Sequence, residues 1–565
     1  MANAFSSLSR DALFDRVGDQ EYDLLVVGGG ITGCGIALDA ANRGMRTLLI
    51  EMQDFAAGTS SRSTKLVHGG LRYLKQLEVK MVAEVGKERA IVYENGPHVT
   101  TPERMMLPIY KGGTFGKLST SLGLLVYDYL AGVKRSERRK MLNVSSTKQR
   151  EPLLKQEGLL GSGYYVEYRT DDARLTIEVL KRAVEFGATA LSYAKVEQFL
   201  YRDGKVTGAK VADQVTGRTA DVYAKKIVNA TGPWVDTLRE MDRSKKGKQL
   251  RLTKGIHLII DQSRFPLKQA VYFDTPDKRM IFAIPRDGKT YVGTTDTFFE
   301  GDTAHPRMTI ADRAYVINAI NDMFPETRID ESDIESSWAG VRPLIYEEGK
   351  DPSEISRKDE IWVSASGLIT IAGGKLTGYR KMAEMVADLV AGKLASEYGH
   401  KVKECVTKHI PISGGDVGGS RYLEAFVEQK AAAAQAHGLS AAAGRKLARF
   451  YGSNVDRVFR IGGQEAAASA AHYELPLDLY LALVYAVKEE MTVKPVDFFI
   501  RRTGALLFNI DLVYRYKKQT LRCMGDLLQW DVQTRTQYAE ELELELRDAV
   551  VPLDAPPLQP IRKSV

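Results

Sequence analysis

Cysteine is scarce in this chain of 565 residues, and its three cysteines form no recognisable pattern. Cys34, Cys405 and Cys523 lie far apart, so neither a disulfide framework nor a zinc knuckle is indicated. The eight histidines also lack the spacing of metal ligands, and we expect no metal. A reducing cytosol is the expected compartment.

Long hydrophobic runs are missing as well. No stretch reaches the ~18 uncharged apolar residues of a membrane-spanning helix. Residues 1–20, which we interpret as an N-terminal extension, lack the apolar core of a signal peptide. The most apolar segment, Leu118 to Arg135, contains Asp128 and is followed by basic residues. It fits either a membrane-surface element or a core helix with a solvated basic end, and the sequence leaves both open.

Strong charge of one sign is absent too. The 79 basic and 72 acidic residues give a net charge of +7, which predicts a local basic patch rather than a polybasic binder of nucleic acid. Such a patch suits an anionic ligand or a membrane surface. The length and the 44% hydrophobic content predict a globular protein with two or three lobes.

A nucleotide-binding signal stands near the N-terminus. An apolar run, Leu24 to Val27, is typical of a buried parallel strand, and a predicted helix follows the glycines Gly28, Gly30 and Gly33. A second predicted strand, Thr47 to Ile50, ends in Glu51, which can accept bonds from ribose hydroxyls. This βαβ unit predicts a dinucleotide-binding domain, with tight helix-strand packing as the alternative role of the glycines. Glu51 disfavours a 2′-phosphate, which leaves FAD or NAD.

Two later segments resemble pieces of the same domain. A predicted strand, Ile227 to Ala230, runs into Gly232, and another, Leu368 to Ala372, runs into Gly373, Gly374 and a helix. The free N–H groups at that second junction suit the partial negative charge of a reduced isoalloxazine. A split domain with one helix directed at the pyrophosphate and one at the ring is typical of a flavoprotein, so FAD is the favoured cofactor.

The stretch "SSRSTKLVHGGLRYLK", residues 60–75, follows soon after Glu51 and must pass beside the cofactor. Its hydroxyls and backbone amides can satisfy pyrophosphate and ring atoms. The Gly69-Gly70 pair allows the main chain to approach the flavin closely, and we expect Arg72 to point to the substrate.

Six motifs occur in a fixed order: "VVGGGITGCGIALDAANRG", "TSSRSTKLVHGGLRYL", "VNATGPWVD", "GTTDT", "GVRPL" and "AGGKLTGYRKMAE". With them the chain closely resembles FAD-dependent, aerobic-type glycerol-3-phosphate dehydrogenases, densely over about residues 21–395. The resemblance implies an α/β fold, with a Rossmann-like FAD-binding domain of the D-amino-acid-oxidase/glutathione-reductase type. It further implies an inserted α+β substrate cap, in segments near 95–165 and 240–355, and a helical C-terminal domain over 400–565.

The resemblance also implies an activity. Members oxidise sn-glycerol 3-phosphate to dihydroxyacetone phosphate and usually pass the electrons to a membrane quinone. We therefore expect a cytoplasmic enzyme bound peripherally to the inner face of the cell membrane; a homodimer is compatible with the residues, which leave the oligomeric state open. The alternative is a soluble oxidase that makes hydrogen peroxide, disfavoured because no surplus insertion stands between Asp302 and Asp333. A flavin-holding, RNA-associated protein would need a basic patch with stacking aromatics, so we expect no nucleic acid.

Matching the motifs residue by residue assigns the site. The implied substrate pocket comprises Arg72, Tyr73, His257, Arg279, Arg342, Arg357, Lys375 and Thr377, with Arg357 the loosest match. We assign His257, Arg342 and Lys375 to catalysis. The predicted FAD contacts are Gly28, Gly30, Ile31, Thr32, Gly33, Glu51, Thr59, Ser60, Ser61, Ser63, Lys65, His68, Gly69, Gly70, Leu71, Gly232, Gly373, Gly374, Lys375, Leu376 and Thr377.

The residue types fit this chemistry. Several arginines are expected around a phosphate monoester, because planar guanidinium groups bind it in bidentate geometry. His257 suits a base that removes the C2 hydroxyl proton, with a structural role or a water-assisted arginine as alternatives. Arg342 suits an electrostatic contact to the developing oxyanion.

Two charged groups carry other interpretations. Asp171 and Asp172 could form an acid/base pair, but we predict that they cap the following helix, whose apolar face is Leu175, Val179, Leu180 and Ala183. The basic cluster Arg515, Lys517, Lys518 and Arg522 is interpreted as a solvated face, with docking to anionic lipid or a partner as the alternative.

Overall fold

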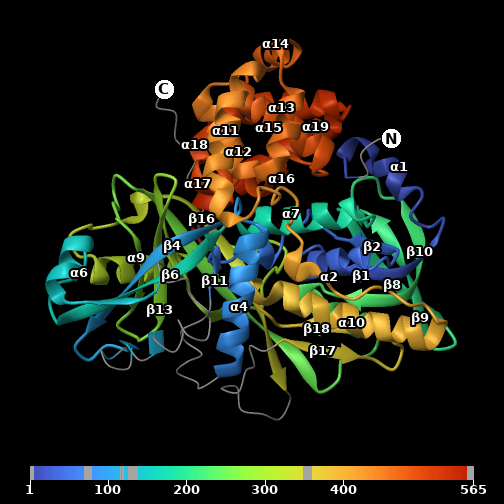
Figure 1. Ribbon diagram of the computed structural model, residues 1–565, viewed down its shortest axis with the longest axis horizontal. Helices are drawn as coiled ribbons and strands as arrows, with labels where there is room; N and C mark the ends of the chain where they lie inside the picture. The colour runs from blue at the N-terminus through green and yellow to red at the C-terminus, as the bar shows by residue number, and fades with distance from the viewer. Residues whose placement is uncertain are drawn as a thin grey trace.

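The computed structural model describes residues 5–68, 79–114, 116, 120, 121, 123, 124, 138–347 and 359–556. Within these ranges two large β-sheets lie side by side, and a domain of helices sits across one end of both (Figure 1). No helix in the described ranges is long and apolar enough to cross a membrane. The segment Leu118 to Arg135 falls largely outside these ranges, so its role stays a prediction.

The first sheet has the strand order β17-β18-β10-β1-β2-β7, with β9 and β8 continuing from β10. Its five central strands, from β18 to β7, run parallel. This is the Rossmann-like arrangement that the sequence predicts. The strands are β1 (Glu21–Val27), β2 (Thr47–Ile50), β7 (Thr189–Leu191), β8 (Ala194–Arg202), β9 (Lys205–Asp213), β10 (Thr219–Asn229), β17 (Glu360–Val363) and β18 (Ile369–Ala372).

Both faces of this sheet are covered, which explains the continuous apolar runs. Leu24 and Val26 pack with the helices α2 (Ile31–Asn42), α7 (Asp172–Glu185) and α10 (Tyr379–Tyr398). Leu25 and Val27 point the other way, toward the β8–β9 hairpin. The strand ends and the N-terminus of α2 therefore meet at one edge of the sheet.

The second sheet has the order β15-β11-β14-β13-β12-β4-β6-β3, with β16 paired to β11 and β5 to β6. Helix α9 (Ile310–Met323) covers one face, and the helical domain packs against the other. The pairing of β3 with β6 brings the segment after Glu51 into this sheet. The strands are β3 (Leu66–Val67), β4 (Thr100–Tyr110), β5 (Lys140–Leu142), β6 (Leu159–Thr170), β11 (Lys248–Asp261), β12 (Ala270–Asp274), β13 (Met280–Arg286), β14 (Lys289–Gly293), β15 (Thr297–Phe298) and β16 (Ile334–Glu347).

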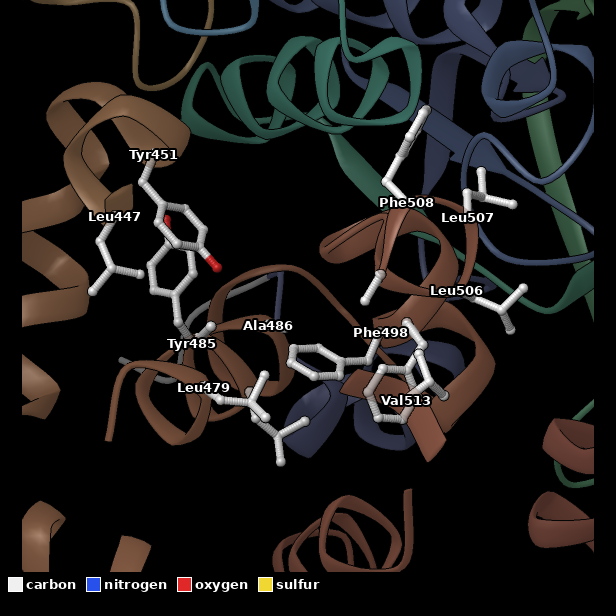
Figure 2. Close-up of a cluster of buried hydrophobic side chains, with 14 of the residues drawn as sticks. Leu447, Tyr451, Leu479, Tyr485, Ala486, Phe498, Leu506, Leu507, Phe508 and Val513 are labelled. Atoms are coloured by element: carbon white, nitrogen blue, oxygen red, sulfur yellow. The ribbon is translucent and has the colours of Figure 1, made fainter. Parts of the chain in front are cut away.

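The C-terminal region is helical, as predicted. Its core contains Tyr485 and Phe498 (Figure 2). Tyr291 and Trp338 of the second sheet belong to the same core. Its helices are α11 (Leu423–Ala433), α12 (Ala441–Tyr451), α13 (Val455–Ile461), α14 (Gln464–His472), α15 (Leu477–Glu489), α16 (Pro495–Asp497), a π-turn (Phe498–Arg502), α17 (Ala505–Phe508), α18 (Ile510–Leu527) and α19 (Val532–Val550). The other α-helices of the described ranges are α1 (Arg10–Phe14), α4 (Val79–Asn95), α6 (Val144–Arg150) and α8 (Val235–Met241).

Candidate active site

The turn between β1 and α2 depends on glycine. Gly28 has φ +115°, and a Cβ there would lie 2.5 Å from the carbonyl oxygen of Ala230. A Cβ on Gly33 would lie 1.9 Å from the carbonyl oxygen of Gly28. The N-cap, Gly30, has no side chain, and Ile31 N donates instead to Ser60 Oγ at 2.9 Å. The first turn of α2, which includes Thr32, is thus suited to hold a pyrophosphate.

Glu51 directly follows β2 and faces this turn. Its Oε2 accepts a hydrogen bond from Gly29 N at 2.7 Å, and its Oε1 accepts one from Gln53 N at 2.9 Å. Burial raises the pKa of Glu51, and the two backbone bonds oppose that shift. Each carboxylate oxygen of Glu51 accepts one of these bonds and can accept a second one. The two oxygens could therefore bind two ribose hydroxyls.

Asp172 anchors the segment that follows Glu51 in the chain. Ser63 donates to Asp172 Oδ2 from its N (3.1 Å) and its Oγ (2.7 Å). Lys65 Nζ lies 2.6 Å from Asp172 Oδ1 and donates to Ser61 O at 2.9 Å. The ammonium of Lys65 is thus engaged by the protein itself. The hydroxyl of Ser61 is buried without a hydrogen-bond partner in the described residues, and it is a candidate for a cofactor contact.

The two adjacent acids turn out to have different roles. Asp171 is the N-cap of α7, and its side chain accepts from Arg174 N at 3.0 Å, as predicted. Asp172 stands in the first turn and binds Ser63 and Lys65, so its interpretation as a cap is wrong. The sequence could not distinguish them, because the partners of Asp172 lie more than 100 residues away.

The junction after β18 meets the same segment. Gly373 and Gly374 have positive φ angles of 77° and 94°, and Leu376 begins a 3₁₀ turn before α10. The hydroxyl of Thr377 accepts from His68 N and donates to His68 O, both at 3.1 Å. Burial lowers the pKa of His68 to about 4, and the charge of Lys375 contributes to that shift. The His68 ring is therefore neutral, as a flavin neighbour can be.

Two other predicted contacts flank the segment. Gly232, with φ +56°, follows β10 where the sequence predicts a turn. Thr59 Oγ1 donates to Val341 O at 2.6 Å, which ties the segment to β16 beside Arg342.

Strands β11 and β16 bring His257 and Arg342 to one face of the second sheet. His257 lies opposite Trp338, Gly255 opposite Gly340, and Thr253 opposite Arg342. Since side chains two residues apart share a face, the histidine and the arginine flank the glycine pair.

The His257 ring is held tightly. It stacks on Trp338 with centroids 4.6 Å apart and planes at 13°, and Nε2 lies 3.1 Å from Thr64 Oγ1. Burial lowers its pKa well below 6.5, and the charges of Arg342 and Lys65 lower it further. A neutral ring with one unprotonated nitrogen can accept a proton.

The "GTTDT" motif positions both groups. Arg342 Nη2 donates to Thr294 Oγ1 at 2.8 Å, and Nη1 donates to Thr295 O at 3.2 Å. A Cβ on Gly293 would lie 2.3 Å from His257 Cδ2, so glycine allows the ring to occupy its position. The motif therefore fixes the guanidinium and leaves space for the imidazole.

Other predicted residues are not brought into this group. Arg279 lies on the exposed turn before β13 and pairs with Asp277 at 3.3 Å, and no contact joins it to His257 or Arg342 among the described residues. Six predicted residues lie outside the described ranges: Gly69, Gly70, Leu71, Arg72, Tyr73 and Arg357.

Sequence reasoning missed several supporting residues. Thr64 lies within the quoted stretch, so its hydroxyl was available as a signal. Trp338 carried none, because its contact follows from strand register. Thr294 stood in the quoted "GTTDT" motif and Asp172 was interpreted as a cap, but the partners of both are set by strand register and helix packing.

Comparisons with known proteins agree with this geometry. The model of the FAD dependent oxidoreductase family matches residues 23–380, and the model of the C-terminal domain of alpha-glycerophosphate oxidase matches residues 405–535. The chain is 63% identical to the aerobic glycerol-3-phosphate dehydrogenase of Bacillus subtilis over 98% of this chain and 100% of that protein. Its Staphylococcus epidermidis counterpart is 59% identical, over 98% and 99% of the two chains. The chain belongs to the FAD-dependent glycerol-3-phosphate dehydrogenase family.

A solved structure supports this membership, and a second one shares the fold. The glycerol-3-phosphate dehydrogenase of Bacillus halodurans, solved with FAD, is 51% identical and superimposes with a TM-score of 0.85, over 98% of this chain and 100% of that one. The L-alpha-glycerophosphate oxidase of Mycoplasma pneumoniae, at 17% identity and a TM-score of 0.54, shares the fold over 68% of this chain and 97% of its own. As a member of this family, the chain has FAD as its cofactor. Three features fit FAD: the glycine turn, the Glu51 carboxylate that accepts from Gly29 N, and the Ser61 hydroxyl that has no partner in the described residues.

Proposed function

We propose that this enzyme oxidises sn-glycerol 3-phosphate to dihydroxyacetone phosphate, with FAD accepting the hydride from C2. The observation that carries the proposal is the placement of a neutral, buried His257 and a fixed Arg342 on one sheet face. Both adjoin the segment that ends at His68, where the FAD motifs converge.

His257 is proposed to take the C2 hydroxyl proton. Its ring is held by Trp338 and Thr64, and its Nδ1 is buried without a hydrogen-bond partner in the described residues. Arg342 would attract the negative charge that develops on the C2 oxygen, and its guanidinium is oriented by Thr294 and Thr295 and pairs with Asp296 at 3.4 Å. Lys375, beside His68, is proposed to complete the pocket with Thr377.

The cofactor would be held from three sides. The turn at Gly28 to Gly33 and Glu51 are proposed to bind its pyrophosphate and ribose, and Thr59 to His68 its central part. The junction at Gly373 and Gly374 is proposed to face the isoalloxazine. The predicted substrate cations Arg72, Arg279 and Arg357 remain part of the proposal, although the proposed role of Arg279 requires its exposed turn to approach the substrate.

Substrate reduction of the flavin tests the proposal directly. Anaerobic addition of sn-glycerol 3-phosphate to the holoenzyme should bleach the flavin absorbance, whereas the mirror-image sn-glycerol 1-phosphate should bleach it far more slowly. Arg342→Ala should reduce turnover on the order of a hundredfold while FAD stays bound. Full turnover in that variant, or no bleaching of the wild type, would refute the assignment.

For the second half-reaction we propose a membrane quinone as acceptor, with the protein bound peripherally to the inner face of the cell membrane. The short connection between Asp302 and Asp333, which contains α9 of 14 residues and a 3₁₀ turn, supports a dehydrogenase. The alternative is an oxidase that reduces O₂ to hydrogen peroxide, and the match of residues 405–535 to a glycerophosphate oxidase domain favours it. Peroxide formation as fast as dye reduction would select the oxidase. Co-sedimentation with anionic but not zwitterionic vesicles would support the membrane proposal.

A further inference from the structure

A cavity of about 610 Å³ lies between the helical domain and the second sheet. Figure 2 shows Leu447 and Tyr451 on one side of this region and Phe508 on the other. The walls come from α12, α15, α17 and α18 on one side, and from the ends of β4, β6 and β13 with the start of α7 on the other. None of the described residues assigned to FAD or substrate lines it.

The inner wall of the cavity is apolar and aromatic. Seven apolar or aromatic residues of the lining are at most 8% exposed: Val99, Leu447, Tyr451, Leu479, Ala482, Ala505 and Phe508. A cavity of several hundred Å³ with such a lining is typical of sites that bury small organic molecules.

The charged part of the wall has an excess of cations. The cationic lining residues are Arg169, Arg174, Arg286, Lys446, Arg449 and Arg515, and the acidic ones are Asp171, Asp287 and Asp478. The three acids are already paired, Asp171 and Asp287 with Arg286 at 3.0 and 3.2 Å, and Asp478 with Lys446 at 3.6 Å.

Three of the other cations pair with acids outside the lining. Arg169 meets Glu103, Arg174 meets Glu178 and Glu490, and Arg449 meets Glu424. The remaining cation, the exposed Arg515, makes no ion pair within the described part of the chain.

Two lining side chains also have unsatisfied polar atoms. The side chain of Arg286 is only 10% exposed, and its Nη1 atom has no hydrogen-bond partner in the described ranges. Both ring nitrogens of His98, which is 8% exposed, likewise lack partners there. Buried polar groups are normally satisfied, so the chain by itself leaves this wall incomplete.

We propose that this cavity binds an amphipathic organic anion of the fatty-acid type. The apolar body would lie against Leu447, Leu479, Ala482 and Phe508, and the carboxylate would be attracted by Arg515. An apolar chain matches the inner wall, and a single anionic group matches the one cation without an acidic partner. The proposal does not depend on the substrate proposed above.

The site is separate from the active site but adjoins it. The Phe508 ring lies 5.8 Å from Trp338, which also stacks on the His257 ring at 4.6 Å. Arg286 lies 4.2 Å above the same Phe508 ring. A ligand in the cavity should therefore bind together with sn-glycerol 3-phosphate rather than compete with it.

The test uses the fluorescent anion 1-anilinonaphthalene-8-sulfonate with the holoenzyme, and decanoate as competitor. One saturable site is expected, displaced by decanoate, more weakly by the neutral 1-decanol, and not by saturating sn-glycerol 3-phosphate. Displacement by sn-glycerol 3-phosphate would overturn the proposal, because the probe would then occupy the active site. Binding without saturation would overturn it too.

Two variants locate the site. Ala482→Trp fills the cavity and should weaken decanoate binding by about tenfold or more, which corresponds to about 1.4 kcal/mol. Because Arg515 is exposed, Arg515→Glu should leave the fold intact. It should weaken decanoate binding by about fivefold. Lys518→Glu, an exposed residue of the same helix outside the lining, makes the same charge change and should have little effect. Equal effects of Arg515→Glu and Lys518→Glu, or unchanged binding in Ala482→Trp, would refute the proposal.

Discussion

Replacing Asp172 with asparagine should weaken FAD binding, because this carboxylate fixes the segment that we propose to lie against the cofactor. Asp172 is fully buried, Lys65 is 4% exposed at its side chain, and their charged atoms are 2.6 Å apart. Asp172→Asn is nearly isosteric, yet it leaves the ammonium of Lys65 buried without its counter-charge. Removing one partner of a buried ion pair costs about 3–5 kcal/mol.

The cost of Asp172→Asn falls on residues 61–65, since Ser61 and Ser63 also belong to this network. If only molecules with an ordered segment bind FAD, a 3 kcal/mol cost raises the dissociation constant of FAD by about a hundredfold or more. Flavin fluorescence during reconstitution of the apoenzyme measures that constant. Lys65→Met combined with Asp172→Asn removes the stranded charge and should recover part of the loss.

Asp312→Asn is the matched control for this prediction. It breaks another buried lysine–aspartate pair at 2.6 Å, with Lys254, between α9 and β11. Both single variants should lower the unfolding temperature, but only Asp172→Asn should weaken FAD binding strongly. Equal FAD affinity in the two variants would show that the Asp172 network does not organise the cofactor segment.

Three further predictions concern the active site and the domain contact. The ratio of the wild-type kcat/KM to that of His257→Gln should stay flat from pH 6 to 8.5, because the lowered pKa of His257 keeps its imidazole neutral in the free enzyme. A fall of that ratio below about pH 6.5 would contradict this prediction. Gly255→Ala would place a Cβ 2.3 Å from Arg342 Nη2, so turnover should fall at least about tenfold with FAD retained. The control is Gly392→Ala, where a Cβ meets nothing within 4 Å, and its turnover should match that of the wild type. The carboxylates of Glu545 and Asp548 raise the pKa of His305, so this contact stabilises the fold fully below about pH 6.5 and loses that effect as pH rises through the raised value. Unfolding temperatures of wild type should therefore drop more between pH 6 and pH 8 than those of His305→Gln, and equal drops would exclude the contact.

Local patterns in the sequence were sufficient for the cofactor domain. The predicted strand Thr47 to Ile50 coincides with β2, and those at Leu24, Ile227 and Leu368 overlap β1, β10 and β18. The apolar face predicted for α7, from Leu175 to Ala183, is buried as expected. These features follow from short-range steric and hydrophobic requirements, which a contiguous stretch of residues expresses directly. The helix predicted after Gly374 is α10, in which Met382 and Val386 are buried and Met385 is 41% exposed.

The sequence by itself determined the glycines at the strand ends and the acid after the second strand. It also predicted arginines and a histidine for a phosphorylated alcohol, of which the structure brings His257 and Arg342 to one sheet face. Only the tertiary structure decided that His257 stacks on Trp338, that "GTTDT" orients Arg342, and that Asp172 binds Lys65 instead of capping its helix. The reason is physical. Strand register and the packing of distant elements set these contacts, and no local pattern records which residues of two remote segments will lie opposite each other.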